Sequence, residues 1–156
     1  MKLVLMTTTS SHERWAEEAR KLYLEKISHF MAIEIQEIKP NRNSRSQGHL
    51  KASEESEKFL MALKPDDYVI VFDERGDQLT SPAFSKKIER VLMSGKKRCI
   101  FVVGGAFGLS EAVRRRADVN ISLSPMVFNH LVAQTVALEQ IYRAFTIIKN
   151  LPYHNI

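Results

Sequence analysis

Two short, wholly apolar runs constrain the fold of this chain most: Tyr68–Phe72 reads YVIVF and Cys99–Val103 reads CIFVV. A strand with no polar face belongs in the middle of a sheet that is covered on both sides. Helical patterns precede and follow each run. Strands that alternate with helices predict an α/β protein with a parallel-type sheet and helices on both faces.

The rest of the chain continues this alternation. Strands are expected at residues 2–8, 32–38, 68–72, 99–103 and 119–123, and helices at about 10–30, 52–63, 81–93, 109–117 and 130–149. Ser10 or Ser11 would cap the first helix, and Ser81 followed by Pro82 marks the start of the third. We find no repeat and no linker, so a single domain over residues 1–156 is expected.

Composition narrows the class of protein. With 44% apolar and 26% charged residues, the chain has the make-up of a soluble globular protein. No apolar run approaches the ~18 residues of a membrane helix, and the N-terminus turns polar too soon for a signal peptide. The single Cys99 lies in an apolar run and cannot form an internal disulfide. A cytoplasmic location is expected.

The net charge of +5 suits an anionic partner such as RNA. Two basic clusters stand out. Residues 39–53 contain no acidic residue and four cations, which are Lys39, Arg42, Arg45 and Lys51. The second cluster is Arg114–Arg116. Each cluster is equally well explained as a solvated surface, so charge alone leaves both interpretations open.

Three strand ends are candidate ligand sites, because parallel α/β proteins bind ligands beyond the carboxyl ends of their strands. They lie at residues 72–73, 103–105 and 123–124. Gly104, Gly105 and Gly108 would let backbone approach a ligand, although a plain tight turn explains them equally well. The loop Ser124–Asn129 contains adjacent Met126, Val127 and Phe128, which either pack on the core or wall a pocket for a flat ligand.

The last helix is apolar on almost all sides, which is typical of a helix at the centre of a fold or in a subunit interface. Glu139 and Arg143 lie four residues apart on it and can pair. The histidines lack the spacing of metal ligands, and the chain has no GxSxG or CxxC motif. Hydrolase and metalloenzyme functions therefore have little support, and no metal is expected.

Together these segments resemble a known family. The GG-x-x-GL turn at Gly104–Leu109, the loop into Phe128-x-His130 and the ending EQIYRAFTI…PYH are similar to those of SPOUT, or α/β-knot, RNA methyltransferases. The most similar branch methylates N3 of a pseudouridine in large-subunit (23S) ribosomal RNA. Length and element order match over the whole chain, and the motifs match over about its last third.

The resemblance implies a homodimer with a deep C-terminal trefoil knot, which binds S-adenosylmethionine in the knot loops and acts on ribosomal RNA or the assembled ribosome. Two alternatives stay open. One is a SPOUT methyltransferase that acts on another RNA, such as transfer RNA. The other is a catalytically silent module that binds the ribosome or RNA.

The resemblance also assigns residues. For cofactor binding it implies Phe72, Gly104, Gly105, Ser124, Pro125, Met126, Val127, Phe128 and Asn129. Around the site and the dimer face it implies His130, Glu139, Tyr142, Arg143, Tyr153 and His154. Among these we expect catalytic roles for Arg143, Tyr153 and His154: the tyrosine ring would stack on the target base, and the imidazole would bind the base or relay the N3 proton. RNA contacts are expected from Lys39, Arg42, Arg45, Lys51 and His130.

The chain departs from the family pattern in three places. The family commonly has proline where Asn129 stands, arginine where Gln134 stands, and a more apolar, glycine-containing turn where this chain has Thr7-Thr8-Thr9. Asparagine still permits a tight turn. Loss of the arginine removes a cation available to RNA phosphate or to the partner subunit. The sequence therefore does not identify the target nucleotide.

Overall fold

A computed structural model describes residues 1–8, 13–39 and 48–154, apart from the side chains of residues 48–51. Its strands are β1 (Lys2–Thr8), β2 (Ile33–Ile38), β3 (Tyr68–Gln78), β4 (Arg98–Val103) and β5 (Val119–Ser122). Its helices are α1 (Arg14–Ser28), α2 (Gly48–Ala62), α3 (Ser81–Met93), α4 (Glu111–Arg116) and α5 (His130–Ile148). The predicted five-fold alternation of strand and helix is confirmed.

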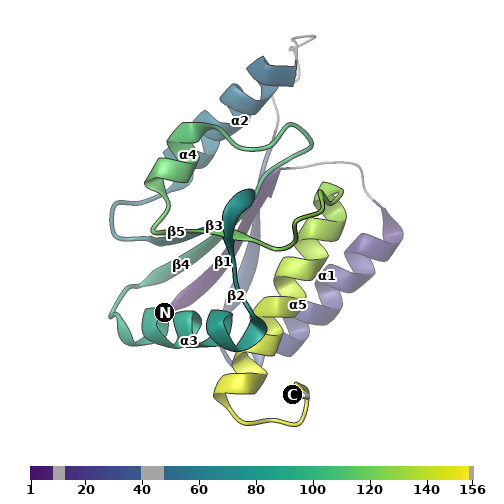
Figure 1. Ribbon diagram of the computed structural model, residues 1–156, viewed down its shortest axis with the longest axis vertical. Coiled ribbons are helices and arrows are strands. Elements are labelled where there is room, and N and C mark those ends of the chain that lie inside the picture. The colour runs from purple at the N-terminus through teal and green to yellow at the C-terminus, as the bar shows by residue number, and fades with distance from the viewer. Residues whose placement is uncertain (9–12, 40–47, 155–156) are drawn as a thin grey trace.

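The five strands form one sheet in the order β2-β1-β4-β3-β5, and every neighbouring pair is parallel. Helices α2 and α4 cover one face, and α1, α3 and α5 cover the other (Figure 1). Strands β4 and β3 lie inside the sheet, as their apolar sequences predict. The predicted trefoil knot stays a prediction.

Successive side chains of the central strands point into two separate cores, because neighbouring residues of a strand face opposite sides of the sheet. On β1, Leu3 and Leu5 pack with α1, α3 and α5, whereas Val4 and Met6 pack with α2 and α4. The same alternation continues to the end of the strand, where Thr7 and Thr8 are both buried. The two threonines therefore meet different helices.

The predicted serine caps are wrong. Helix α1 begins at Arg14, after the N-cap residue Glu13, and the predicted caps Ser10 and Ser11 lie outside the described residues. Helix α3 is capped by Thr80, whose hydroxyl accepts a hydrogen bond from the N–H of Ala83 at 3.3 Å. Ser81 is thus the first residue of the helix rather than its cap, and the helix begins one residue earlier than predicted. Both errors are small shifts at helix ends, where local sequence signals are weakest.

Strand β3 continues well beyond the predicted end at Phe72. Phe72 pairs with Ile121 of β5, and after a shift in register Asp77 pairs with the same residue. A Cβ atom on Gly76 would lie 2.5 Å from the backbone nitrogen of Ile121, so no side chain fits at Gly76. The intervening residues 73–76 interrupt the regular pairing, and residues 73–75 line a cavity at the carboxyl edge of the sheet.

Helix α5 begins at this carboxyl edge and runs back along the sheet, so residues 149–154 lie at the opposite end of the molecule (Figure 1). Within the ranges that the structure describes, no helix combines the length and apolar character that a membrane crossing needs.

Candidate functional site

A cavity of about 590 Å³ opens at the carboxyl edge of the sheet. Its wall is made by three segments: residues 72–75 after the first part of β3, residues 103–109 at and after β4, and residues in the range 123–133 between β5 and the first turn of α5. These are the three strand ends that the sequence predicts as ligand sites. Parallel pairing brings them to one edge although they are distant in sequence.

The structure gathers eight of the nine predicted cofactor residues around this cavity; Pro125 is not among the lining residues. The eight are Phe72, Gly104, Gly105, Ser124, Met126, Val127, Phe128 and Asn129. Met126 and Val127 are 75% and 79% exposed, so they do not pack on the core. Of the two interpretations of this loop, the structure favours a pocket wall.

The glycine turn after β4 has two different physical requirements. Gly108 has φ of +76°, a left-handed conformation that favours glycine, and its N–H donates to the carbonyl of Gly105 at 3.1 Å. A Cβ atom on Gly105 would lie 2.7 Å from Oγ1 of Thr8 and 2.9 Å from a carboxylate oxygen of Glu55. Gly105 therefore lacks a side chain because β1 and α2 pack against it, whether or not a ligand is bound.

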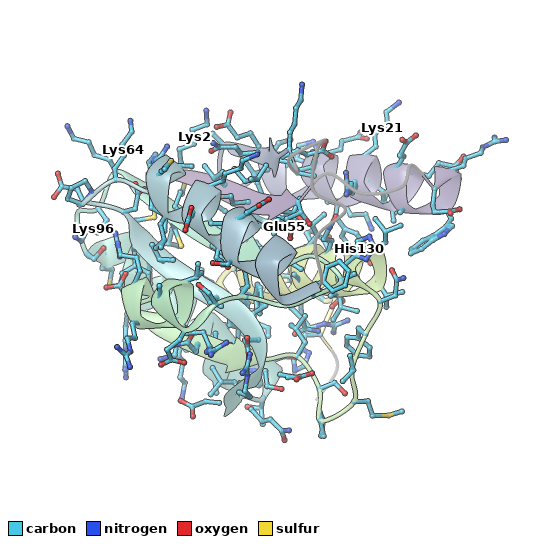
Figure 2. The ribbon with its side chains drawn as sticks, turned by 90° about the horizontal axis from the view of Figure 1, so that it is seen from above. Lys2, Lys21, Glu55, Lys64, Lys96 and His130 are labelled. Atoms are coloured by element: carbon cyan, nitrogen blue, oxygen red, sulfur yellow. The ribbon has the colours of Figure 1, made fainter. Side chains whose placement is uncertain are left out.

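Hydrogen bonds within the loop before α5 shape the other wall. The N–H of Met126 donates to Oγ of Ser124 at 2.9 Å, and Asn129 Oδ1 accepts from the N–H of Leu131 at 2.9 Å, which caps α5. His130 lines the cavity, and its Nε2 is buried without a partner among the described residues. Viewed onto this edge, Glu55 and His130 lie near the middle of the molecule, and the labelled lysines lie toward its outline (Figure 2).

Asp73 supplies a buried negative charge at the edge of the cavity. Its carboxylate accepts from Nε of Arg75 at 2.9 Å and lies 3.5 Å from Nη1 of Arg114. Burial alone would raise the pKa of Asp73, but the hydrogen bonds from Arg75 and the charges of both arginines lower it overall. Asp73 is thus an ionised anchor for two arginines.

The three predicted catalytic residues come together, but at the far end of α5. Glu139 accepts from Nε of Arg143 at 3.0 Å and from the hydroxyl of Tyr153 at 3.1 Å, and Arg143 Nη1 lies 3.2 Å from His154 Nδ1. Burial, then the hydrogen bond and charge of Glu139, raise the pKa of Tyr153. We call Glu139, Arg143, Tyr153 and His154 the tail cluster.

The tail cluster does not line the cavity of its own chain. Arg143 follows His130 by 13 residues (143 − 130) on α5, which corresponds to about 20 Å along a helix. The chain after α5 folds back beside the lower end of that helix (Figure 1). There the rings of Tyr142 and Tyr153 meet edge to face, with their centroids 4.8 Å apart. Within one chain, the cavity and the tail cluster are separate sites.

Comparison with known proteins assigns the family. A sequence profile described as "Predicted SPOUT methyltransferase" matches residues 1–154. The chain belongs to the SPOUT methyltransferase family. It is 54% identical over 156 residues to a protein of Bdellovibrio bacteriovorus named ribosomal RNA large subunit methyltransferase H, and the match covers 100% of both chains. A protein of the same name from Christiangramia forsetii is 38% identical, with 99% of this chain and 98% of that protein covered.

Solved structures show the same fold at low sequence identity. A probable methyltransferase from Bordetella pertussis has a TM-score of 0.58 and 13% identity, with 92% of this chain and 95% of that chain covered. A probable methylase family protein from Haemophilus influenzae has a TM-score of 0.52 and 13% identity, with 95% of this chain and 66% of that chain covered. At this identity the likeness supports the fold alone.

Two of the three departures from the family pattern meet in the structure of this SPOUT methyltransferase. Gln134 is fully buried, and its Nε2 donates to Oγ1 of Thr7 at 2.5 Å. Its Oε1 accepts from the guanidinium of Arg20, which also binds Glu37 at 2.8 Å. Arg20 of α1 therefore brings a guanidinium to Gln134, the position at which the family commonly has an arginine. Nothing in the local sequence around Arg20 predicts this contact, although a glutamine in an apolar helix is a signal for a buried polar partner.

The basic clusters differ in how much the structure says about them. Lys39 is exposed, and its carbonyl accepts from Nζ of Lys58 at 2.7 Å. Arg42, Arg45 and the side chain of Lys51 lie outside the described residues. In the second cluster, Arg114 and Arg115 pair with Glu111, and Arg116 donates to the carbonyl of Lys64 at 2.8 Å. That cluster is engaged in holding α4, which favours the structural interpretation.

Two observations in the part of the chain that the structure describes concern metal ligands and the thiol. No group of three or more His, Cys, Asp or Glu residues there is arranged to hold a metal ion. Cys99 is buried, and desolvation raises the pKa of its thiol to about 12. It is therefore a packing residue rather than a nucleophile.

Proposed function

We propose that this protein is an S-adenosylmethionine-dependent methyltransferase that methylates N3 of a pseudouridine in large-subunit (23S) ribosomal RNA. The observation that carries the proposal is the 54% identity, over the full length of both chains, to a protein named as a large-subunit ribosomal RNA methyltransferase. An enzyme with this substrate would act in the cytoplasm.

The cavity fits S-adenosylmethionine. Its volume of about 590 Å³ lies in the range of small-molecule sites. Phe72, Leu109 and Leu123 give it apolar surface that suits an adenine ring, and the glycine turn and the loop after Ser124 give it backbone groups. S-adenosylmethionine, when bound, supplies a methyl group that is already electrophilic. The residues of the chain then have to bind the cofactor and the base, orient them toward each other, and accept or relay one proton.

That proton is the hydrogen on N3 of the base, which must leave as the nitrogen gains a methyl group. We assign its removal or relay to His154, in keeping with the ordinary role of histidine in proton transfer. The guanidinium of Arg143 can only donate, so His154 Nδ1 accepts in their contact and the neutral ring carries its hydrogen on Nε2. In this state Nε2 donates to a carbonyl of the base or to a phosphate. To take the N3 proton, the ring has to leave Arg143 and turn its unprotonated nitrogen toward the base. The raised pKa of Tyr153 keeps its phenol neutral, which suits a stacking platform better than a base.

The separation of the cavity and the tail cluster supports a homodimer, in which the tail cluster of one subunit serves the cavity of the other. Apolar side chains of α1 and α5 are exposed and available for such an interface. Trp15 and Leu22 are each 47% exposed, and Val132 is 36% exposed. Large side chains of this kind, set on two adjacent helices, are typical of the contact core of a dimer.

RNA would approach over the same edge of the sheet. The exposed Lys39 follows β2, whose carboxyl end lies at this edge, and we assign phosphate contacts to it and to Arg42, Arg45 and Lys51. His130 lines the cavity, and we assign to it a contact with the base or its ribose.

The other two functions have no comparable support. The silent-module hypothesis depends on Asn129 and Gln134, and both have structural roles: Asn129 caps α5 and Gln134 binds Thr7. Nothing in the described residues favours transfer RNA over ribosomal RNA, and the relatives are named as ribosomal RNA methyltransferases.

The deciding experiment compares RNA from cells with and without this protein. Nucleosides of 23S ribosomal RNA and of transfer RNA are quantified by mass spectrometry, and purified protein with S-adenosylmethionine is added back to ribosomes from the deletion strain. We expect N3-methylpseudouridine to vanish from 23S RNA on deletion and to return on addition. A change confined to transfer RNA supports a methyltransferase that acts on transfer RNA. No change in either RNA, together with no calorimetric binding of S-adenosylmethionine, supports the silent module.

A further inference from the structure

Four polar side chains link the first turns of α5 to the ends of β1 and β2. Arg20 on α1 donates through Nη1 to Glu37 at 2.8 Å and through Nη2 to Gln134. Gln134 donates in turn to Thr7 at 2.5 Å. The guanidinium therefore sits at a junction of two helices and two strands, and all of these contacts lie near the carboxyl edge where the cavity opens.

This network is more buried than its chemistry favours. Gln134 and Thr7 are fully buried, and the side chain of Arg20 is 15% exposed. Nε of Arg20 is buried and has no partner among the described residues. A buried donor without a partner costs stability, and apolar residues in place of a buried ion pair are often as stable or more stable. Stability alone thus does not account for a guanidinium at this position.

The residues held by the network adjoin the cavity. Ala133, next to Gln134, lines the cavity, as does His130 one turn earlier. On the other side, Thr7 is followed by Thr8, whose hydroxyl lies against Gly105. One strand end thus bears on α5 through Thr7 and on the glycine turn through Thr8. A shift of α5 relative to β1 would move two walls of the cavity against each other.

From these contacts we propose that Arg20 is a positioning residue for the cofactor cavity: acting through Gln134 and Thr7, it fixes the first turns of α5 against the carboxyl edge of the sheet. The inference rests on the proposed function, because it takes S-adenosylmethionine as the occupant of the cavity. Arg20 itself does not line the cavity. It acts on affinity by holding the walls in the geometry that the bound molecule needs.

The test measures the Kd of S-adenosylmethionine by calorimetry for three variants: Arg20→Met, Gln134→Leu and the double variant. Each single substitution breaks the same link, so we expect each to raise Kd about tenfold, the scale on which supporting side chains act in other preorganised sites. The Kd of the double variant should stay within about twofold of the higher Kd of the two single variants, because the effects of substitutions within one network do not add. In methyl transfer, KM for S-adenosylmethionine should rise while kcat changes little.

Two further methionine variants separate positioning from general loss of stability. Arg14→Met removes an exposed arginine from the same helix, where it pairs with Glu18. Arg98→Met breaks a buried ion pair with Asp67, at the start of β4 and away from the cavity. Both should bind S-adenosylmethionine within about twofold of the wild type, although Arg98→Met unfolds more easily. Arg20→Lys keeps a cation for Glu37 but lacks the second arm of the fork, so it should reproduce the rise in Kd if Arg20→Met does not fold.

Each outcome is decisive. A wild-type Kd in Arg20→Met, or in Arg20→Lys where Arg20→Met is unfolded, overturns the positioning role and leaves the proposed function intact. An equal rise in Arg98→Met overturns it as well, because the effect would then follow stability. A rise of about a hundredfold in the double variant would mean that Arg20 and Gln134 act independently, and it would overturn a role of Arg20 through Gln134. No binding to the wild-type protein would overturn the proposed function and this inference together.

Discussion

The ion pair between Asp67 and Arg98 allows a quantitative test of what holds this sheet together. The carboxylate of Asp67 is buried and accepts from Arg98 Nε at 2.7 Å and Nη2 at 2.5 Å. It also accepts from the backbone N–H of Lys64 at 2.7 Å. The pair joins the turn before β3 to the start of β4. Arg98→Met keeps most of the side-chain stem and leaves a buried carboxylate without its cation.

The expected loss is large. Removing one partner of a buried ion pair costs about 3–5 kcal/mol. We expect about 3 kcal/mol at pH 7, the lower end, because the Arg98 side chain is 21% exposed and Lys64 still donates to the carboxylate. With a urea m-value of about 2 kcal/mol/M, the unfolding midpoint should fall by about 1.5 M.

The loss should depend on pH in a defined direction. Burial alone would raise the pKa of Asp67, but the hydrogen bonds and charges of its partners lower it overall. A lowered pKa contributes stability that is present above the ordinary pKa of about 3.9 and is lost as pH falls through the folded value. In Arg98→Met the largest cause that remains is burial, which raises the pKa. The difference between wild type and variant should therefore shrink as pH falls from 7 to 4.

Urea unfolding followed by circular dichroism measures both effects, with all proteins at one protomer concentration because dimerisation would shift the midpoint. The control is Arg115→Met, which removes an arginine that is 79% exposed and pairs with an exposed glutamate. That variant should have the same urea midpoint as the wild type, because exposed ion pairs often contribute nothing measurable to stability. The reasoning is refuted if Arg98→Met loses less than about 1 kcal/mol at pH 7, or if its deficit stays constant down to pH 4.

Four further changes test other parts of the structure. Gly76→Ala would place a Cβ atom 2.5 Å from the backbone of Ile121, so it should lose about 3 kcal/mol or more in urea unfolding. Gly95→Ala, at φ +72° with open space around it, should lose about 1 kcal/mol, and equal losses would exclude the steric cause. Deletion of residues 152–156 should abolish methyl transfer and leave calorimetric binding of S-adenosylmethionine within about twofold; full activity would remove the tail from catalysis. Neutralising the four cations in residues 39–51 should make the plot of log K for RNA binding against log salt concentration less steep. The slope should change by up to ~0.9 per lost phosphate contact, and an unchanged slope would assign the four cations to a solvated loop.

The strands and helices were predictable because their signals are local. Alternating or wholly apolar runs separated by helical spacing were enough to predict five strand–helix units, and strand ends were enough to predict where the cavity opens. The order of strands in the sheet was not predictable, because pairing between β1 and β4 leaves no mark in either sequence. The continuation of β3 was missed for a related reason: residues 73–78, DERGDQ, are polar and lack the pattern of a strand.

The site was predictable in part. The loop residues and the glycine turn carried a recognisable motif, and the structure brings them to one cavity. The contacts of Gln134 were hidden, because its partners Arg20 and Thr7 are 114 and 127 residues away. The distance of the tail cluster from the cavity was not predictable either, because the sequence does not show against which part of α5 the C-terminal segment packs.

The interleaved strand order has a consequence during synthesis. Strand β1 leaves the ribosome early, but one of its two edges pairs with β4, which begins 90 residues after Thr8 (98 − 8). At ~5–20 residues per second, that edge stays open for about 5–18 s. An apolar strand with an open edge is a template for pairing with other chains. Newly made chains should therefore be most prone to aggregate before residue 103 emerges, and to escape that hazard when β4 docks.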